Sequence, residues 1–197
     1  MDAQGRVLIA QRPAGKHLAG HWEFPGGKLE SGEERRVGLA RELREELGIV
    51  IGGTPRPLIR LEHSYPDKQV HLDIFVVRRY QGEPQGREGQ ALRWVSQDEL
   101  EGVELLPADG PIVAALRLPE RLTGLTVGEL RGAPCEGMAD AMAASDAGAD
   151  FLVMLHELPH GEVRSICELV PVPVYVRGME LEAAWELGAT GVVGGAG

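Results

Sequence analysis

The pattern of hydrophobic and polar positions is most regular in residues 34–47, which are predicted to form a helix. At about 100° per residue, one stripe of this helix is apolar and consists of Leu39, Ala40, Leu43 and Leu47. The adjacent face holds three carboxylates, those of Glu42, Glu45 and Glu46. Like charges at this spacing destabilise a helix by roughly a few tenths of a kcal/mol per pair, and the residue four after Glu42 is another glutamate. The pattern therefore indicates a face that holds cations.

Short apolar runs on both sides of this helix predict the strands of an α+β domain. They comprise residues 6–11, 22–24, 58–63, 70–79 and 91–95. Two further helices are expected, one starting at Ser96 and one over residues 111–118. Gly48 is expected to end the long helix as its C-cap residue.

The pattern changes after residues 119–134, a stretch with Pro, Gly and Thr that is expected to be a connector. Beyond it, helices are predicted over residues 136–147, 161–169 and 180–187, and strands over residues 150–154, 172–176 and 191–193. Such alternation is typical of a parallel α/β arrangement. The predicted organisation is a first domain at residues 1–118, a connector at 119–134 and a partial α/β segment at 135–197.

Length and composition narrow the class of protein. The chain has 197 residues, of which 43% are hydrophobic, enough for one large or two small domains. Its formal net charge of −10 argues against a broad nucleic-acid or anionic-membrane surface, because either would need to be basic. Only two cysteines and no apolar N-terminal segment predict a cytoplasmic protein with reduced thiols. These observations leave the oligomeric state open.

The segment from Gly27 to Ile49 resembles the signature of Nudix hydrolases. It holds Gly27, five further residues, Glu33, seven further residues and then Arg41-Glu42-Leu43-Arg44-Glu45-Glu46-Leu47-Gly48-Ile49. Flanking residues are similar to the MutT-type branch, namely Arg12, Trp22-Glu23-Phe24-Pro25-Gly26-Gly27, Tyr65-Pro66-Asp67, Gly82-Glu83-Pro84 and Gly86-Arg87-Glu88-Gly89-Gln90. That branch hydrolyses oxidised purine nucleoside triphosphates such as 8-oxo-dGTP, and the resemblance covers about residues 4–117.

The resemblance implies an α+β Nudix fold, in which a mixed sheet is sandwiched between helices. In the family another strand precedes the turn at residues 2–5, so the chain is expected to begin with this first strand missing. An unpaired edge in the sheet would follow, because a strand without a neighbour leaves its backbone N–H and C=O groups unpaired.

The resemblance also implies roles for single residues. The implied metal ligands are the backbone carbonyl of Gly26 and the carboxylates of Glu42, Glu45, Glu46 and Glu88. The implied structural residues of the motif are Gly27, Glu33, Arg41 and Gly48, with an ion pair between Arg41 and Glu33. The implied substrate contacts are Arg12, Glu23, Phe24 and Asp109. Carboxylate oxygens suit Mg²⁺ as the cofactor, with Mn²⁺ as the alternative.

Two questions of chemistry stay open at this level. The carboxylate that takes the proton of the attacking water is Glu42 or, as the alternative, Glu88. Asp109 stands where the MutT-type branch usually has asparagine, and an ionised carboxylate only accepts hydrogen bonds, whereas a buried, protonated one also donates. An ordinary turn aspartate before a helix fits the position nearly as well.

The leading hypothesis is a Mg²⁺-dependent nucleoside triphosphate pyrophosphohydrolase that converts 8-oxo-dGTP to the monophosphate and pyrophosphate. Such an enzyme serves nucleotide-pool sanitation and DNA repair. One alternative is a Nudix hydrolase of another diphosphate-linked substrate, and a second is a non-catalytic, vestigial nucleotide-binding protein. The expected partner is a small-molecule nucleotide, with neither nucleic acid nor membrane involved.

The C-terminal segment resembles the later strands of thiamine-phosphate-synthase-like (TenI-type) barrels. The stretches that carry this likeness are Gly148-Ala149-Asp150-Phe151, Pro173-Val174-Tyr175-Val176, Ala183-Ala184-Trp185 and Gly188-Ala189-Thr190-Gly191-Val192-Val193. The resemblance covers about residues 133–194 and implies a partial, TIM-barrel-like α/β segment, because three strands cannot close an eight-stranded barrel.

One motif matches a zinc-binding pattern but does not predict a zinc site. His156-Glu157-Leu158-Pro159-His160 matches the HExxH pattern of zinc proteases. Pro159 breaks the helix that would have to bring both histidines to one face, so a zinc site is not predicted.

Overall fold

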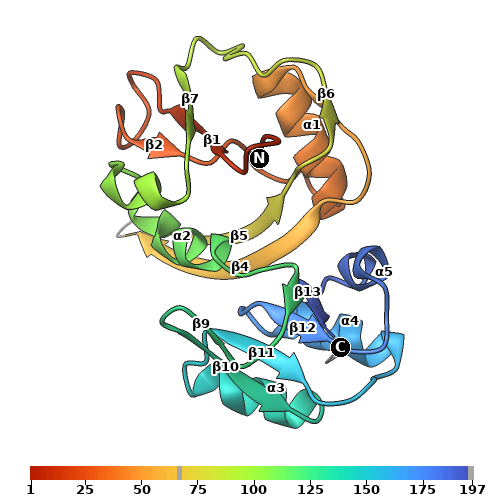
Figure 1. Cartoon of the computed structure of the whole chain (residues 1–197). Coiled ribbons are helices and arrows are strands. Elements are labelled where there is room, and N and C mark those ends of the chain that lie inside the picture. Colours follow the sequence, from red (N-terminus) through yellow and green to blue (C-terminus); the bar gives the residue numbers. More distant parts are fainter. Residues whose placement is uncertain (66–67, 195–197) are drawn as a thin grey trace. The chain divides into compact units, whose positions relative to one another are not determined.

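The computed structural model describes residues 1–65 and 68–194, and the chain divides into two compact units (Figure 1). The first unit comprises Met1–Pro55 and Val77–Val113, and the second comprises Arg56–Val76 and Ala114–Gly197. The sequence-based border at residue 118 lies close to the change of unit after Val113. The second unit, however, also takes in a hairpin from the middle of the first predicted domain.

Helix α1 (Arg35–Leu47) has well-defined ends. Glu34 precedes it in an extended conformation, and its carboxylate accepts hydrogen bonds from two N–H groups of the first turn. Gly48 ends it with a φ of 73°, the left-handed conformation that glycine adopts without steric cost. Leu43 and Leu47 of the apolar stripe are buried in a core cluster with Leu8 and Ile49. The helix and its C-cap are therefore as the sequence predicts.

The strands of the first unit pair antiparallel. β1 (Val7–Gln11) lies between β2 (Trp22–Glu23) and β7 (Leu92–Val95), and β3 (Val50–Ile51) pairs with β6 (Tyr80–Gln81). β1 is the central strand of its three-stranded sheet, and its apolar residues are buried.

Within residues 1–65 and 68–118, the named strands pair only antiparallel, and the parallel part of the expected mixed sheet is limited to an isolated bridge between Trp22 and Leu105. The named strands belong to three antiparallel sheets, and β4 (Arg56–Tyr65) and β5 (Lys68–Val76) make up a hairpin of their own. In each of these sheets, neighbouring strands run in opposite directions and exchange backbone hydrogen bonds. Within the three-stranded sheet, β1 has a partner on each side.

Two short 3₁₀ helices lie between β7 and the end of the first unit. They comprise Asp98–Gly102 and Pro107–Asp109. The helix expected from Ser96 is the first of them, and the helix expected over residues 111–118 is α2 (Gly110–Leu116).

The second unit holds a six-stranded sheet in the order β8-β13-β12-β11-β10-β9 (Figure 1). Its strands are β8 (Arg121–Leu122), β9 (Thr126–Val127), β10 (Leu130–Cys135), β11 (Phe151–Met154), β12 (Val174–Val176) and β13 (Gly191–Val193). All neighbours run parallel except β9 and β10. The intervening helices are α3 (Met138–Asp146), α4 (His160–Leu169) and α5 (Leu181–Glu186). The parallel α/β prediction is confirmed, whereas the likeness to TenI-type barrels stays a prediction.

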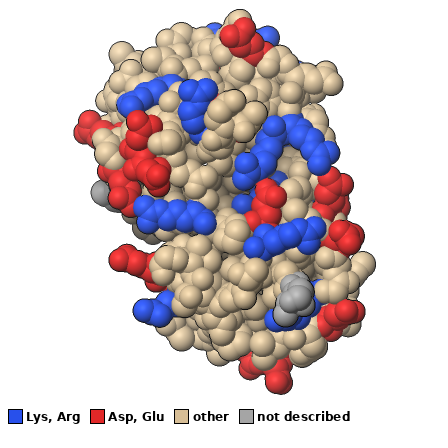
Figure 2. Space-filling view, viewed as in Figure 1, with Lys and Arg blue, Asp and Glu red and all other residues tan. Residues whose placement is uncertain are grey.

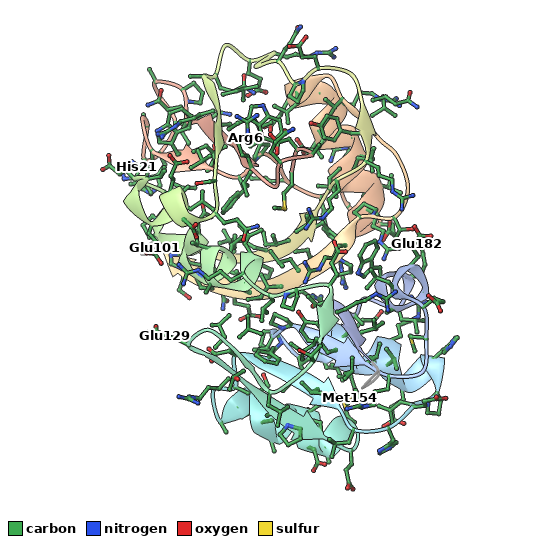
Figure 3. All side chains as sticks on the ribbon, in the orientation of Figure 1. Arg6, His21, Glu101, Glu129, Met154 and Glu182 are labelled. Atoms are coloured by element: carbon green, nitrogen blue, oxygen red, sulfur yellow. The ribbon has the colours of Figure 1, made fainter. Side chains whose placement is uncertain are left out.

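The core of this unit forms around β11, all four residues of which are buried. Met154, labelled in Figure 3, is 1% exposed at the end of that strand. The rings of Phe151 and Tyr175 meet edge to face with their centroids 5.8 Å apart. Cys135 and Cys167 are both buried free thiols, and burial raises the pKa of Cys167 to about 12.

The β4–β5 hairpin is anchored within the second unit by Arg56, which is only 4% exposed. The Arg56 guanidinium donates hydrogen bonds to the carbonyl oxygens of Thr190, Leu118 and Pro119, each at 2.9 Å. The Thr190 hydroxyl in turn donates to the carbonyl oxygen of Leu58 at 3.1 Å. A charged side chain therefore joins the hairpin to the last part of the chain.

The expected connector at residues 119–134 instead contributes strands to this sheet. β8 and β9 lie within it, and most of β10 does too. The short strands are separated by the glycines and threonines that suggested a loop. Within β10, Gly132 is needed for packing, because a Cβ atom there would lie 2.2 Å from the Phe151 ring.

Helix α4 begins at His160, directly after Pro159. His156 therefore lies before the helix, and the two histidines of the zinc-like motif do not share a helical face.

Charges of both signs are interspersed on the face shown in Figure 2. Among residues 1–65 and 68–194, none of the helices has the length and apolar character needed to cross a membrane.

Candidate active site

A pocket in the first unit lies beside the C-terminal end of α1. Its walls come from β1, β2, the loops that follow each of these strands, and the loop before β7. Five of its lining residues belong to the site expected from the sequence, namely Glu23, Phe24, Gly26, Glu46 and Glu88. The fold thus brings together residues that lie up to 65 positions apart in the chain, from Glu23 to Glu88.

Glu46 is the most strongly perturbed carboxyl group of this pocket. Burial, followed by the nearby Glu88 carboxylate, raises the pKa of Glu46 to about 7, and Glu42 contributes in the same direction. A hydrogen bond from the Gly26 backbone and the charge of Lys16 act in the opposite direction and lower this pKa. Negative charge is therefore crowded where the end of α1 meets the loop at Gly26.

Glu42 lies on the same helix, packed against the glycine turn. Its side chain is 16% exposed, and Arg41 Nη1 donates to Glu42 Oε1 at 2.9 Å. A Cβ atom added to Gly27 would lie 2.2 Å from the Glu42 carboxyl group. Glycine is needed at position 27 because any side chain there would displace this carboxylate.

Arg41 and Glu33 form the expected ion pair. Arg41 Nε and Nη2 donate to the two carboxylate oxygens of Glu33 at 2.9 and 2.8 Å, and Nη2 also donates to the carbonyl oxygen of Lys28 at 3.0 Å. These hydrogen bonds from Arg41, with one from the Glu30 backbone, lower the pKa of Glu33 to about 2. The pair ties the loop after the glycine turn to α1.

The donor set suits a hard divalent cation. Glu45 is the most open of the three helix glutamates, with a side chain 62% exposed and 3.4 Å from Arg41 Nη1. In residues 1–65 and 68–194, no three His, Cys, Asp or Glu side chains already lie close enough together to hold a metal ion. The oxygen donors and the crowded charge at Glu46 and Glu88 nevertheless fit Mg²⁺, which would offset that charge.

Arg12, Glu23 and Asp109 form a second group of charged residues, and Glu23 is the one of the three that lines the pocket. Arg12 forms an ion pair with Glu23, and its Nε donates to the carbonyl oxygen of His17 at 2.8 Å. Asp109 is 5% exposed, and its Oδ2 atom has no hydrogen-bond partner among the described residues. Burial and then the charge of Glu23 raise the pKa of Asp109 to about 7, whereas Arg12 lowers it. Asp109 is thus electrostatically linked to Glu23 in the pocket wall.

Lys16 and Gln90 are among the pocket residues that were not expected from the sequence. Lys16 Nζ lies 3.2 Å from Glu88 Oε2, with both side chains about half exposed. No periodicity marks a lysine in a loop, so its position follows only from the folded chain. Gln90 belongs to a stretch that resembles the MutT-type branch, and that stretch was the one available signal for it.

The first part of the chain is similar in sequence to known proteins. A family model described as NUDIX domain matches residues 1–115. An 8-oxo-dGTP diphosphatase of Escherichia coli is 40% identical over 119 residues, which cover 59% of this chain and 89% of that protein. A CTP pyrophosphohydrolase of the same organism is 40% identical over 117 residues, covering 58% of this chain and 84% of that protein.

Solved structures show the same likeness. The E. coli ORF135 protein superposes with a TM-score of 0.52 at 40% identity, over 58% of this chain and 81% of its own. A structure from a study of MutT from Aliivibrio salmonicida and Vibrio cholerae gives a TM-score of 0.51 at 33% identity, over 59% of this chain and 89% of its own. Both similarities fall on about three fifths of the chain.

Proposed function

Because this chain belongs to the NUDIX domain family, we propose that it is a divalent-metal-dependent pyrophosphohydrolase of nucleoside triphosphates, with 8-oxo-dGTP as the favoured substrate. The observation that supports this most directly is the pocket in which Glu46 and Glu88 meet the backbone of Gly26. The 40% identity to an 8-oxo-dGTP diphosphatase supports the choice of substrate. The proposed role is nucleotide-pool sanitation, and thereby DNA repair, in the cytoplasm.

The proposed ligands of Mg²⁺, or of Mn²⁺ in its place, are the carboxylates of Glu42, Glu45, Glu46 and Glu88 and the carbonyl of Gly26. When bound, such an ion offsets phosphate charge and lowers the pKa of coordinated water. Arg41 keeps Glu42 in place through the 2.9 Å hydrogen bond, and Gly27 leaves room for it. Lys16 adds positive charge at the pocket for the triphosphate.

The proposed chemistry is a hydrolytic cleavage of one phosphoanhydride bond. Glu42 takes a proton from the attacking water, with Glu88 as the alternative acceptor. The oxygen of that water forms a new bond to phosphorus while the bond to the bridging oxygen breaks. The products are a nucleoside monophosphate and pyrophosphate.

A pyrimidine triphosphate is the second candidate substrate. The chain is equally similar, at 40% identity, to a CTP pyrophosphohydrolase. The identity of Asp109 supports this candidate when its carboxyl group is ionised, because a carboxylate accepts a hydrogen bond from an exocyclic amine, such as that of cytosine, but cannot donate one to a carbonyl.

Pyrophosphate release from 8-oxo-dGTP, dGTP and CTP, each with Mg²⁺ and with EDTA, tests the proposal. We expect release that requires the metal and is fastest with 8-oxo-dGTP. Faster turnover of CTP would favour the second candidate. A folded protein that releases pyrophosphate from none of the three would contradict the proposed function.

Asp109 gives a pH-dependent stability that can be measured without substrate. Its pKa is raised to about 7 in the folded protein, so the group stabilises the fold fully below the unfolded value near 3.8, and this contribution is lost as the pH rises toward 7. Between pH 5 and 8 the Asp109 carboxyl should therefore cost about 2–3 kcal/mol in the free energy of unfolding.

The Asp109→Asn variant should remove this loss, and urea unfolding at pH 5 and pH 8 measures it. Relative to wild type, the variant should be more stabilised at pH 8 than at pH 5. Asp98→Asn, at an exposed position of the same unit, serves as the control and should show no such difference. An equal effect of Asp109→Asn at both pH values would contradict a folded-state titration of Asp109 between pH 5 and 8.

A further inference from the structure

We propose that Gln90 is a positioning residue that fixes the separation between the Glu46 and Glu88 carboxylates. This inference rests on the proposed function, because it assigns Gln90 to the same site. Gln90 Nε2 donates to the carbonyl oxygen of Glu46 at 3.2 Å, and Gln90 Oε1 accepts from the backbone N–H of Glu88 at 2.8 Å. One side-chain amide thus bridges the helix residue and the loop residue that carry the two pocket carboxylates.

The two hydrogen bonds require an amide of this length. The carbonyl of Glu46 can only accept and the N–H of Glu88 can only donate, so the orientation of the Gln90 amide is fixed by its partners. A carboxylate at position 90 could still accept from Glu88 but could not donate to Glu46. Asparagine has both groups but is shorter by one methylene, about 1.5 Å, and would not span both partners.

The loop is shaped to bring Gln90 to this position. Gly89 donates its N–H to the carbonyl oxygen of Gly86 at 3.1 Å and has a φ of 79°. A Cβ atom on Gly86 would lie 2.0 Å from the carbonyl oxygen of Gln90, so the turn closes only with glycine there. Glu88 sits inside this turn, and its direction is therefore set by the turn and by the Gln90 amide together.

The same loop covers the C-terminal end of α1. The carbonyl oxygen of Glu46 also accepts from the N–H of Arg87 at 3.0 Å, and that of Leu47 accepts from the N–H of Gln85 at 3.0 Å. Arg87 Nη1 donates to the carbonyl oxygen of Arg44 at 3.1 Å. Since these other hydrogen bonds already hold the loop on the helix end, the loss of Gln90 alone should change the geometry of the carboxylates more than the fold.

Electrostatics supplies the reason why such a bridge is useful. Glu46 and Glu88 repel each other, and Lys16 is bound to Glu88 only through a half-exposed ion pair of 3.2 Å. Without a bridge, repulsion would move the loop carboxylate away from the helix whenever no cation lies between them. Gln90 opposes that movement with neutral groups and therefore adds no charge that would compete for the cation.

Two variants disrupt the Gln90 bridge in different ways, and a third serves as the control. Gln90→Glu removes the donor to Glu46, and Gln90→Asn shortens the bridge. Gln85→Asn makes the same amide shortening at an exposed position of the same loop. Mn²⁺ affinity, measured by electron paramagnetic resonance without substrate, is the first readout, and kcat and KM for 8-oxo-dGTP with Mg²⁺ are the second.

Gln90→Asn should weaken Mn²⁺ binding about 10-fold or more and lower kcat more than it raises KM, with little change in Tm. Gln85→Asn should match wild type in every readout. Wild-type Mn²⁺ affinity and kcat in Gln90→Asn would overturn the inference. If wild type binds Mn²⁺ but hydrolyses no triphosphate, the proposed function fails, and the Mn²⁺ affinities alone still decide the role of Gln90.

Discussion

Glutamine in place of Glu46 should lower kcat/KM by roughly 10²–10³-fold, equivalent to about 3–4 kcal/mol of transition-state stabilisation. Glu46 combines burial, a hydrogen bond with the Gly26 backbone and proximity to the Glu88 carboxylate. The amide keeps the shape and the hydrogen-bond acceptor but removes the negative charge that would hold a cation against the phosphates. Steady-state rates of pyrophosphate release at saturating Mg²⁺ measure the loss.

The same variant should not be less stable than wild type without metal. Glutamine relieves a buried charge that lies close to another carboxylate, and functional sites often retain such destabilising groups. Glu83→Gln, at an exposed position in the loop that also carries Glu88, is the matched control and should retain wild-type kcat/KM. Wild-type turnover by Glu46→Gln would show that Glu46 has no role in catalysis.

Methionine in place of Arg56 should lower the free energy of unfolding of the second unit by about 3–5 kcal/mol. The loss arises because three carbonyl oxygens, those of Thr190, Leu118 and Pro119, lose the guanidinium that binds each of them at 2.9 Å. Methionine fills similar space but donates no hydrogen bond. Chemical denaturation followed by circular dichroism gives the free energy.

Arg164→Met provides the comparison, since Arg164 lies exposed on α4 in the same unit. That variant should stay within about 0.5 kcal/mol of wild type. Arg56→Lys should fall between the two, because an ammonium group cannot reach all three carbonyls from one position. A loss below about 1 kcal/mol for Arg56→Met would mean that water replaces the guanidinium and that the other contacts of the hairpin hold it in place.

The sequence predicted the elements of this fold better than their pairing. The α1 helix was placed within one residue at its start, because its periodicity and Gly48 are local signals. The separation of β4 and β5 from the other strands of residues 1–115 was not predicted, since pairing depends on contacts between distant segments. Arg56 illustrates the difficulty, because an arginine is expected at the surface unless its partners are known.

The site was predicted to the extent that its residues belong to a continuous motif. Glu42 and Glu46 were predicted as site residues from the motif at residues 27–49, and Glu88 from the stretch at residues 86–90. The structure places Glu46 and Glu88 in one pocket. The amide bridge of Gln90 could not be predicted, because it depends on a turn that returns the loop to the helix end. The perturbation of Asp109 likewise depends on burial, which no local pattern reveals.

The two buried cysteines allow the opening of the second unit to be followed by chemical modification of the protein itself. Cys135 and Cys167 are the chain's only cysteines, and both lie in that unit. A thiol that is buried and has a pKa of about 12 is inert toward alkylating reagents until its surroundings open. The rate of alkylation therefore measures the opening free energy of this unit in the natural sequence, with no label introduced. Arg60 Nη1 donates to the carbonyl oxygen of Cys167 at 3.2 Å, so detachment of the hairpin would register in that rate as well.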